Sequence, residues 1–222
     1  MQKIAEILDE VLATEETAKQ AKRTSSLHKW SPSMFGRCYR AQWWNKSKEP
    51  LSDPPTAELL RRFQCGKLFH NFIQDLLKKS GMKIEAEVKV ENEDVLGYAD
   101  LIINGEEVGE IKSQHSRAFW WLEKSDKEIE KEKYENLLQL MTYAFILGLH
   151  KTRLILVSKD DLFISEYQRK LDDYWRAEVG KEIRILKTLT TLPPAIPRAY
   201  LDKKTGGSNE CKYCFWQTKC NQ

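Results

Sequence analysis

The chain has 222 residues, of which 41% are hydrophobic and 31% are charged, and its formal net charge is +3. This length and composition suit one domain, or one domain with a small appendage, with a real core. The longest apolar runs, such as residues 144–149, are far too short to span a bilayer, and residues 1–16 lack the basic-then-apolar order of a signal peptide. We therefore expect a cytoplasmic protein that does not enter a membrane.

Helical spacing of apolar residues dominates the first 80 residues. It predicts a helix over residues 3–23 and a longer, more regular one over residues 56–79. Between them, Ser31-Pro32-Ser33 is a helix-start signal that predicts a short helix over residues 34–44. We treat residues 1–30 as a helical lead and residues 31–222 as the main domain.

The apolar period then changes from helical to alternating. Strands are predicted over residues 83–91, 95–103, 107–112, 153–157 and 161–167. Asn104-Gly105, between the second and third strands, is a strong two-residue hairpin signal. Helices are predicted over residues 125–148 and 171–188. This order of elements predicts an α/β fold with a central mixed β-sheet flanked by helices.

Two neighbouring strands carry a candidate catalytic pair. Asp100 lies in an otherwise apolar stretch, where an isolated carboxylate is costly without a cation or a partner. Glu110 falls on the next strand, and Lys112, two residues further, projects to the same face. Carboxylates hold Mg²⁺ or Mn²⁺, which can generate hydroxide near neutral pH, and a nearby lysine can stabilise developing negative charge. Glu-x-Lys alone is more often a solvated strand face.

Two predicted helices offer further candidates. His70 would ordinarily be a core or boundary residue, but beside the two carboxylates it becomes a candidate nitrogen ligand, better suited to Mn²⁺ than to Mg²⁺. Gln139 and Tyr143 are four residues apart and therefore share a helix face. Their spacing alone favours a buried polar pair, and the alternative is a role in placing the substrate phosphate or the catalytic groups.

The five cysteines divide into four candidates for one site and one outlier, Cys65, which lies in an apolar helix pattern. Three are in a CxxCxxxxxC run, Cys211, Cys214 and Cys220, and the fourth is Cys38. Zinc and an iron–sulfur cluster both accept four cysteines. The one-plus-three arrangement favours a cubane cluster, which would tie the amino-terminal helical region to the carboxy terminus.

Several short motifs occur in a specific order along most of the chain. They are Cys38 with Arg40, Gly66 with His70, Gly97 with Asp100, Glu110 with Lys112, Gln139 with Tyr143, and the three terminal cysteines. In this set and order the chain resembles the RecB-like branch of the PD-(D/E)xK nucleases in its iron–sulfur form. The most similar members are the CRISPR-associated single-domain exonucleases and the nuclease domain of AddB.

The resemblance implies a restriction-endonuclease-like core and a deoxyribonuclease that depends on Mg²⁺ or Mn²⁺. It implies metal ligation by His70, Asp100, Glu110 and the carbonyl of Ile111, and catalysis by Lys112 with Asp100, Glu110, Gln139 and Tyr143. It also implies a structural [4Fe–4S] cluster on Cys38, Cys211, Cys214 and Cys220. Relatives cut single-stranded DNA, often as exonucleases with 5′-to-3′ polarity, and some also cut endonucleolytically.

Basic and aromatic residues near the predicted site suggest how DNA would be held. Arg40 and Arg117 can contact phosphates, and Trp120 and Trp121 can stack on the bases of a single strand. Three adjacent aromatic residues, 119–121, cannot all be buried by one helix face, so at least one should be accessible.

Other functions stay open at this point. The chain has no GxxxxGK[ST] motif, so it would be a stand-alone nuclease or a subunit rather than a helicase–nuclease. The resemblance suggests a role in DNA repair, recombination or CRISPR spacer processing in antiviral defence. It is also compatible with partner proteins and with oligomer formation. The alternatives are a non-catalytic or partner-dependent subunit that binds DNA ends, and a zinc-stabilised RNA-binding protein.

Overall fold

The computed structural model describes residues 3–24, 28–124, 129–195 and 209–221. The chain divides into two compact units. The first combines residues 1–28, 37–65 and 191–222, and the second combines residues 29–36 and 66–190. Helix α3 (Ala57–Lys79) begins in the first unit and ends in the second. Among the described residues, no helix is both long enough and apolar enough to cross a membrane.

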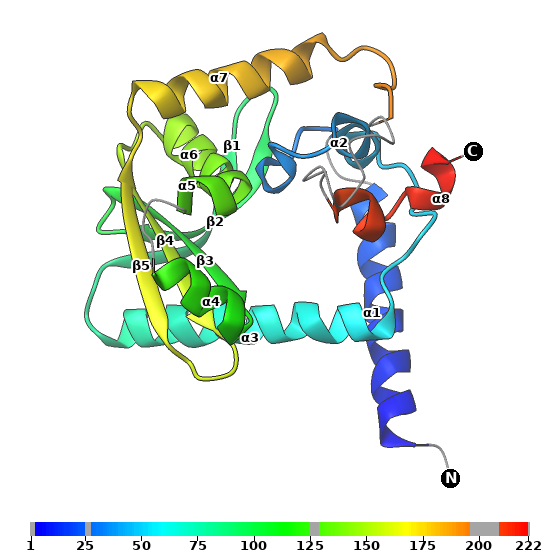
Figure 1. Cartoon of the computed structure of the whole chain (residues 1–222), viewed down its shortest axis with the longest axis horizontal. Coiled ribbons are helices and arrows are strands. Elements are labelled where there is room, and N and C mark those ends of the chain that lie inside the picture. Colours follow the sequence, from blue (N-terminus) through cyan, green and yellow to red (C-terminus); the bar gives the residue numbers. More distant parts are fainter. Residues whose placement is uncertain (1–2, 25–27, 125–128, 196–208, 222) are drawn as a thin grey trace. The chain divides into compact units, whose positions relative to one another are not determined.

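The second unit is built on a five-stranded sheet (Figure 1). Its strands are β1 (Ile84–Glu91), β2 (Leu96–Ile103), β3 (Glu107–Gln114), β4 (Lys151–Ser158) and β5 (Ile164–Lys170). Their order in the sheet is their order in the chain. Neighbours are antiparallel except β3 and β4, which are parallel. The sheet is therefore mixed, as the sequence predicts.

A parallel pair needs a crossover, and helices supply it between β3 and β4. These are α4 (Ser116–Glu123), α5 (Ile129–Glu132) and α6 (Tyr134–Leu147). The helix predicted over residues 125–148 is therefore interrupted at Lys133, whose φ of −120° and ψ of 23° are not helical. Residues 125–128 lie outside the described residues, and α4 was not predicted because its eight residues show too few turns for a clear period.

Local sequence chemistry fixes the β2–β3 hairpin. Asn104 and Gly105 both have left-handed backbone angles, with φ of 53° and 71°. Two such residues make the turn whose twist matches that of the flanking strands, and Asn and Gly adopt this conformation most readily. The predicted hairpin is confirmed, although its loop holds three residues, 104–106, rather than two, because Ile103 pairs with Glu107. It brings Asp100 and Glu110 onto adjacent strands.

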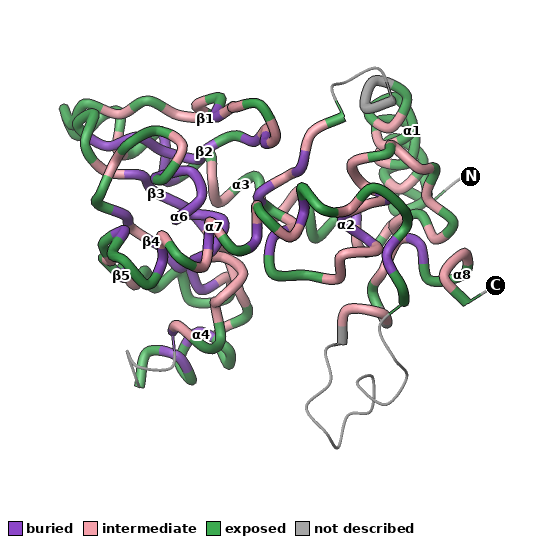
Figure 2. Tube along the Cα trace, turned by 90° about the horizontal axis from the view of Figure 1, so that it is seen from above, coloured by how far each residue is buried: buried purple, intermediate pink, exposed green. Residues whose placement is uncertain are grey.

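One hydrophobic cluster of the second unit lies between the sheet and α3. Ile73 of α3 packs with apolar side chains of β2, β3 and β4, namely Leu101, Ile103, Ile111, Ile155 and Val157. Helices α6 and α7 (Asp173–Thr188) lie on the other side of the sheet in Figure 1. Buried residues concentrate in β2, β3, β4 and α6 (Figure 2). Each central strand is thus covered on both sides.

The first unit is helical and holds both chain ends. It contains α1 (Ile4–Thr24), α2 (Tyr39–Lys46), the 3-10 turn η5 (Asn209–Tyr213) and α8 (Gln217–Cys220). The predicted helix over residues 34–44 is displaced, because a 3-10 turn, η1 (Pro32–Met34), ends before Gly36 and α2 starts only at Tyr39. Buried Trp216 packs against Trp44 in a tilted arrangement with ring centroids 6.1 Å apart, which anchors the carboxy-terminal segment.

Candidate active site

Glu110 is fully buried at the centre of the candidate site. Its Oε1 accepts a hydrogen bond from Gln139 Nε2 at 2.8 Å and a second from the Lys112 ammonium, while its Oε2 is buried with no hydrogen-bond partner. Burial raises the pKa of Glu110 above its ordinary value of 4.5, and the charge of Asp100 adds to this rise, while Lys112 opposes it. A buried carboxylate oxygen without a donor is the position that a cation would stabilise.

Asp100 is buried on β2, and its side chain, rather than the backbone of β2, binds the backbone N–H of Ile111 on β3. Its Oδ2 accepts a hydrogen bond from the backbone N–H of Ile111 at 2.7 Å, and the paired register of the two strands stops one residue earlier, at Leu101 and Gly109. Ile111 itself packs in the apolar core beside α3. The strand residues named for a metal site are therefore adjacent, and the carboxylate of Asp100 fixes the backbone at Ile111.

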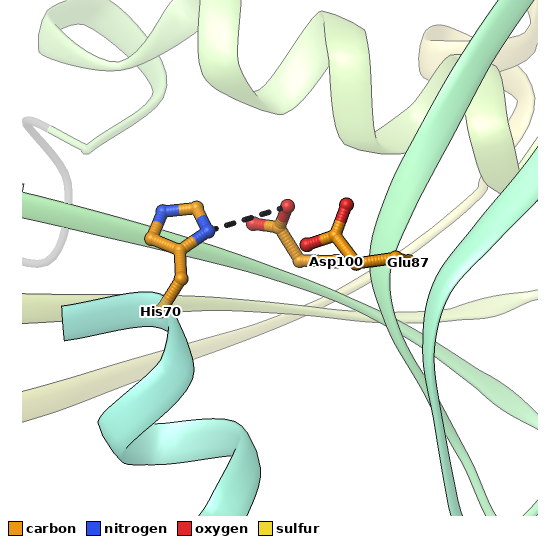
Figure 3. Close-up of side chains that lie close together, drawn as sticks. All are labelled: His70, Glu87 and Asp100. Atoms are coloured by element: carbon orange, nitrogen blue, oxygen red, sulfur yellow. Dashed lines mark ion pairs between the residues drawn. The ribbon is translucent and has the colours of Figure 1, made fainter. Parts of the chain in front are cut away.

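His70 reaches this site from α3. Its Nδ1 lies 3.6 Å from Asp100 Oδ1. Although burial would lower the pKa of His70, the hydrogen bond and charge of Asp100 raise it above its ordinary value of 6.5. Figure 3 shows the ring directed at Asp100, with Glu87 of β1 on the far side of that carboxylate. Among the described residues, only His70, Glu87 and Asp100 bring three ligand atoms within 4.8 Å of one another.

Glu87 was missed by the sequence analysis. It belongs to an alternating strand whose charged positions look solvated, and its side chain is indeed exposed. Its backbone, however, has a φ of 53°, in the left-handed region, although Ala86 and Val88 on either side stay paired with β2. Gln74 of α3 donates from Nε2 to Glu87 Oε1 and to the carbonyl of Asp100, each at 3.2 Å.

Tyr143 and Gln139 form the predicted buried pair on α6, and Gln139 also reaches the carboxylate of Glu110. Gln139 Nε2 lies 3.4 Å from the Tyr143 hydroxyl as well as 2.8 Å from Glu110. Burial raises the pKa of Tyr143 far above its ordinary value of 10, with a further rise from the charge of Glu110, so the phenol stays neutral. Gly97 leaves room for it, since a Cβ there would lie 2.7 Å from the hydroxyl oxygen.

A second lysine lies near Lys112 and was also missed. Lys133 precedes α6, and burial lowers the pKa of its ammonium. The charge of Glu132 opposes this lowering, whereas the charge of Lys112 contributes to it. No periodic signal marks Lys133, because its position depends on the break between α5 and α6.

A hollow lies along α4, which follows the strand that bears Lys112. Its volume is about 870 Å³, and it is lined by His115, Arg117, Ala118, Trp120, Trp121, Lys124 and Glu132. Phe119 is buried, whereas Trp120 is 39% and Trp121 53% exposed, so the prediction that at least one of the three aromatics is accessible is confirmed. Trp120 is held in place by a 2.8 Å hydrogen bond from its Nε1 to Asp161 and by edge contact with Phe163.

The cysteines predicted to share a cluster all belong to the first unit and influence one another. Burial raises the pKa of Cys38, Cys211 and Cys214, and the charge of Cys220 contributes to each rise. No three of these thiols come within 4.8 Å of one another among the described residues. Arg40 lies two residues after Cys38, and its guanidinium sits 5.1 Å from the ring centre of Trp44 in the first unit.

Comparison with known proteins shows the fold of this chain. No protein-family model and no curated protein matches it. The crystal structure of SSO0001 matches with a TM-score of 0.60 and 20% identity, over 99% of this chain and 96% of that one. LHK-Exo in complex with dAMP matches with a TM-score of 0.53 and 16% identity, over 72% of this chain and 87% of that one.

A second structure of LHK-Exo, described as an alkaline exonuclease from Laribacter hongkongensis, matches with a TM-score of 0.50 and 14% identity. It covers 81% of this chain and 94% of that one. At these identities the likeness concerns the fold, and it agrees with the mixed sheet and flanking helices described above. The chain therefore has the α/β fold of these exonuclease structures.

Proposed function

We propose that the protein is a divalent-metal-dependent deoxyribonuclease. The observation that carries this proposal is Glu110, which is fully buried, held at one oxygen by Lys112 and Gln139, and left without a partner at the other. Asp100 lies on the neighbouring strand, and its charge acts on Glu110. The shared fold with exonuclease structures supports the same activity.

The chain's own residues have distinct roles in this proposal. Asp100, Glu110, His70 and the carbonyl of Ile111 would hold Mg²⁺ or Mn²⁺, which polarises the phosphate and lowers the pKa of a bound water. Lys112 donates to Glu110 and is placed to orient the attacking water or to stabilise the phosphorane charge. Gln139 holds the carboxylate of Glu110 through a hydrogen bond. The Tyr143 hydroxyl contacts the Gln139 amide, so Tyr143 would act as a positioning residue for Gln139.

Single-stranded DNA is the proposed substrate, cut as an exonuclease with 5′-to-3′ polarity favoured and endonuclease activity allowed. The hollow along α4 is lined by Arg117, Trp120 and Trp121 among others, and its first lining residue is His115. Because His115 is three residues after Lys112, the chain between them can span at most about 11 Å. The hollow's cationic and aromatic side chains suit a phosphate backbone and stacked bases. Arg40, in the first unit, is proposed as a further phosphate contact.

The test is Mn²⁺-dependent digestion of end-labelled single-stranded DNA by anaerobically purified protein, beside Asp100→Ala and Lys112→Ala. We expect only the wild type to degrade the strand, and the labelled end then gives the polarity. If all three proteins are folded and inert but bind DNA ends, the chain is instead a partner-dependent subunit. If both variants cut as well as the wild type, the assignment of the site is wrong.

We also propose a structural [4Fe–4S] cluster on Cys38, Cys211, Cys214 and Cys220. The four thiols belong to one unit, and burial raises the pKa of Cys38, Cys211 and Cys214, which disfavours their thiolates unless a cation is bound. Absorption near 400 nm, with iron and sulfide in equal amounts, would support the cluster. A colourless protein that contains zinc would favour the alternative metal.

On the resemblance alone, we propose that the nuclease acts with partner proteins in CRISPR adaptation or in general recombination. The test is copurification of the tagged protein with an integrase encoded beside it, before and after addition of a DNA end. Recovery of the integrase at fixed stoichiometry supports the partnership, and recovery of the nuclease alone under both conditions argues against it.

A further inference from the structure

Tyr98 is the one exposed residue of β2, a strand whose eight residues are all described. It is 52% exposed, whereas Gly97 and Ala99 on either side are buried. Tyrosine is common in strands, so its exposure alone indicates no function. Its place beside the candidate active site, and the charges around it, give the ring a specific use.

Tyr98 projects to the same face of β2 as Asp100, because alternate residues of a strand point to one side. The strand pairs with β1 without an inserted residue, so this alternation is regular. Two residues of strand advance by about 6.6 Å, which is close to the length of one nucleotide in an extended single strand. A DNA strand whose scissile phosphate lies at Asp100 therefore has a neighbouring nucleotide at Tyr98.

The backbone of Tyr98 is tied to the candidate site. Its N–H donates a hydrogen bond to the Tyr143 hydroxyl. That hydroxyl lies 3.4 Å from Gln139 Nε2, which donates to Glu110 at 2.8 Å. Contacts thus run without a break from the backbone beneath the exposed ring to the buried carboxylate. They hold the ring at a fixed place relative to the reacting phosphate.

The side of the site that bears Tyr98 is basic. Lys89 pairs with Tyr98 across β1 and β2, and its ammonium interacts electrostatically with the phenol. Lys89 forms an ion pair with Glu91, which is also paired with Lys29 at 2.8 Å, so two lysines share one carboxylate. The Lys89 side chain is exposed, and an exposed ion pair is weak in water. A phosphate can therefore take the place of Glu91 at Lys89.

Two neighbouring features set the direction of the substrate path. In the other direction along β1 from Lys89, the exposed residues are Glu85 and Glu87, which would repel a phosphate backbone. The hollow along α4 lies on the far side of the carboxylates from β1, because α4 contacts β4 and the strands follow one another from β1 to β5. A single strand can thus leave the hollow, cross the carboxylates and pass over Tyr98.

We propose that Tyr98 and Lys89 form a nucleotide-binding subsite beside the scissile phosphate, in which the Tyr98 ring stacks on a base and Lys89 contacts the adjoining phosphate. This inference rests on the proposed nuclease function and places nucleotides on both sides of the bond that is cut. Stacking tolerates any sequence, because every base has a π-face. The subsite would therefore add affinity for single strands without selecting a base.

The test is fluorescence anisotropy in the Lys112→Ala background with Mn²⁺, so that the DNA is bound and not cut. Short labelled single strands each carry one abasic site, which removes a base and keeps its phosphate. At one position the abasic site should weaken binding by about fivefold to a hundredfold. Adding Tyr98→Thr should abolish this effect, and Tyr98→Phe should retain it. Tyr174→Ala, at an exposed tyrosine on α7, should leave the profile unchanged.

Lys89→Ala tests the subsite without altering β2. It should reduce the slope of log affinity against log salt by about 0.7, the value for one lost phosphate contact on a single strand. Lys151→Ala breaks a similar exposed ion pair, with Glu106, and should leave the slope as it was. Equal slopes for the two lysine variants would overturn the role of Lys89. Threonine keeps the strand preference at residue 98, so Tyr98→Thr should melt as the wild type does.

The outcomes separate this inference from the nuclease function. If the wild type digests single-stranded DNA and Tyr98→Thr keeps its sensitivity to every abasic site, the subsite is wrong and the nuclease assignment stands. If Tyr98→Thr abolishes the sensitivity at one position but the wild type cuts no DNA, the subsite is real and the nuclease assignment is wrong. A protein that binds no single-stranded DNA would overturn both.

Discussion

The hydroxyl of Tyr143 lies directly over Gly97, so closely that a Cβ at residue 97 would be 2.7 Å from its oxygen and 2.8 Å from its ring. We expect Gly97→Ala to displace Tyr143 and with it Gln139, to destabilise the fold by about 1–3 kcal/mol through overpacking, and to reduce cleavage. Thermal melting and the Mn²⁺-dependent digestion assay measure the two effects.

Gly66→Ala is the matched control for this substitution. A Cβ at Gly66 would have no neighbour within 4 Å, and the residue lies inside α3. Alanine should therefore stabilise the helix by about 1 kcal/mol. If both alanine variants melt and cut alike, close packing of Tyr143 over Gly97 has no part in the site.

Gln139 donates the 2.8 Å hydrogen bond that holds Glu110 in place. We expect Gln139→Leu to slow cleavage by about tenfold to a hundredfold, since a hydrogen bond to a charged group contributes about 1.5–3 kcal/mol. Gln168→Leu, a change at an exposed position on β5, should leave the rate unaltered. Single-turnover rates in saturating Mn²⁺ measure this, and equal rates for the two variants would contradict the role of Gln139.

Burial of Glu110 predicts a pH dependence for the metal-free protein. Its pKa in the fold is raised above the ordinary 4.5, so above that pH the unfolded chain gives up a proton that the folded chain retains. The free energy of unfolding should then fall as pH rises, by at most about 1.4 kcal/mol per pH unit for this one group. Urea unfolding in EDTA at a series of pH values measures the slope.

Two comparisons isolate the contribution of Glu110. Glu110→Gln removes the titrating group, so the difference between its slope and that of the wild type belongs to Glu110. Saturating Mn²⁺ should reduce the wild-type slope, because the cation takes the place of the proton on the carboxylate. Identical slopes for wild type and variant would show that the buried carboxylate does not change its protonation on unfolding.

The cysteines give a prediction that does not depend on nuclease activity. If the proposed cluster is present, Cys38→Ser and Cys220→Ser should each lose iron and the absorption near 400 nm, and should melt at lower temperature, because each removes one of the four proposed ligands that join distant segments of the chain. Cys65→Ser should keep both properties, since Cys65 lies on α3 outside the four. Loss of iron in all three variants would point to general misfolding instead.

Trp120 and Trp121 should differ in their effect on DNA binding. Trp121 is 53% exposed, so Trp121→Ala should weaken single-stranded DNA binding by about 1–3 kcal/mol with little change in melting temperature. Trp120 is fixed by Asp161 and Phe163, so Trp120→Ala should also lower the melting temperature. Fluorescence anisotropy with a labelled oligonucleotide measures the affinity, and a Trp121→Ala variant that binds as tightly as the wild type would exclude stacking there.

Features set by local residue chemistry could be predicted from the sequence. The five strands and the long helices follow from apolar period, and the Asn104-Gly105 turn follows from the ease with which these residues adopt left-handed angles. Once that hairpin is fixed, the adjacency of Asp100 and Glu110 follows too. The alternation of buried Ile111 with its polar neighbours places Glu110 and Lys112 on one face of the sheet.

Features that depend on tertiary context could not be predicted. Glu87 has the same pattern as the solvated charges around it, and only the folded structure reveals its left-handed backbone and its contact with Gln74. Lys133 was hidden in an apparently continuous helix because no proline or glycine marks the break. Helix α4 was missed because its eight residues make only about two turns, too few to show a clear apolar period.

The parallel pairing of β3 with β4 sets an order in which the site can assemble during folding. Strands β1, β2 and β3 pair through short connections, which close in microseconds, whereas β3 and β4 can pair only after residues 116–147 have crossed the sheet. Asp100 and Glu110 therefore meet before Gln139 reaches them. A nascent chain would carry the acidic pair without the amide that fixes it, so the complete candidate site forms only after the crossover helices have packed on the sheet.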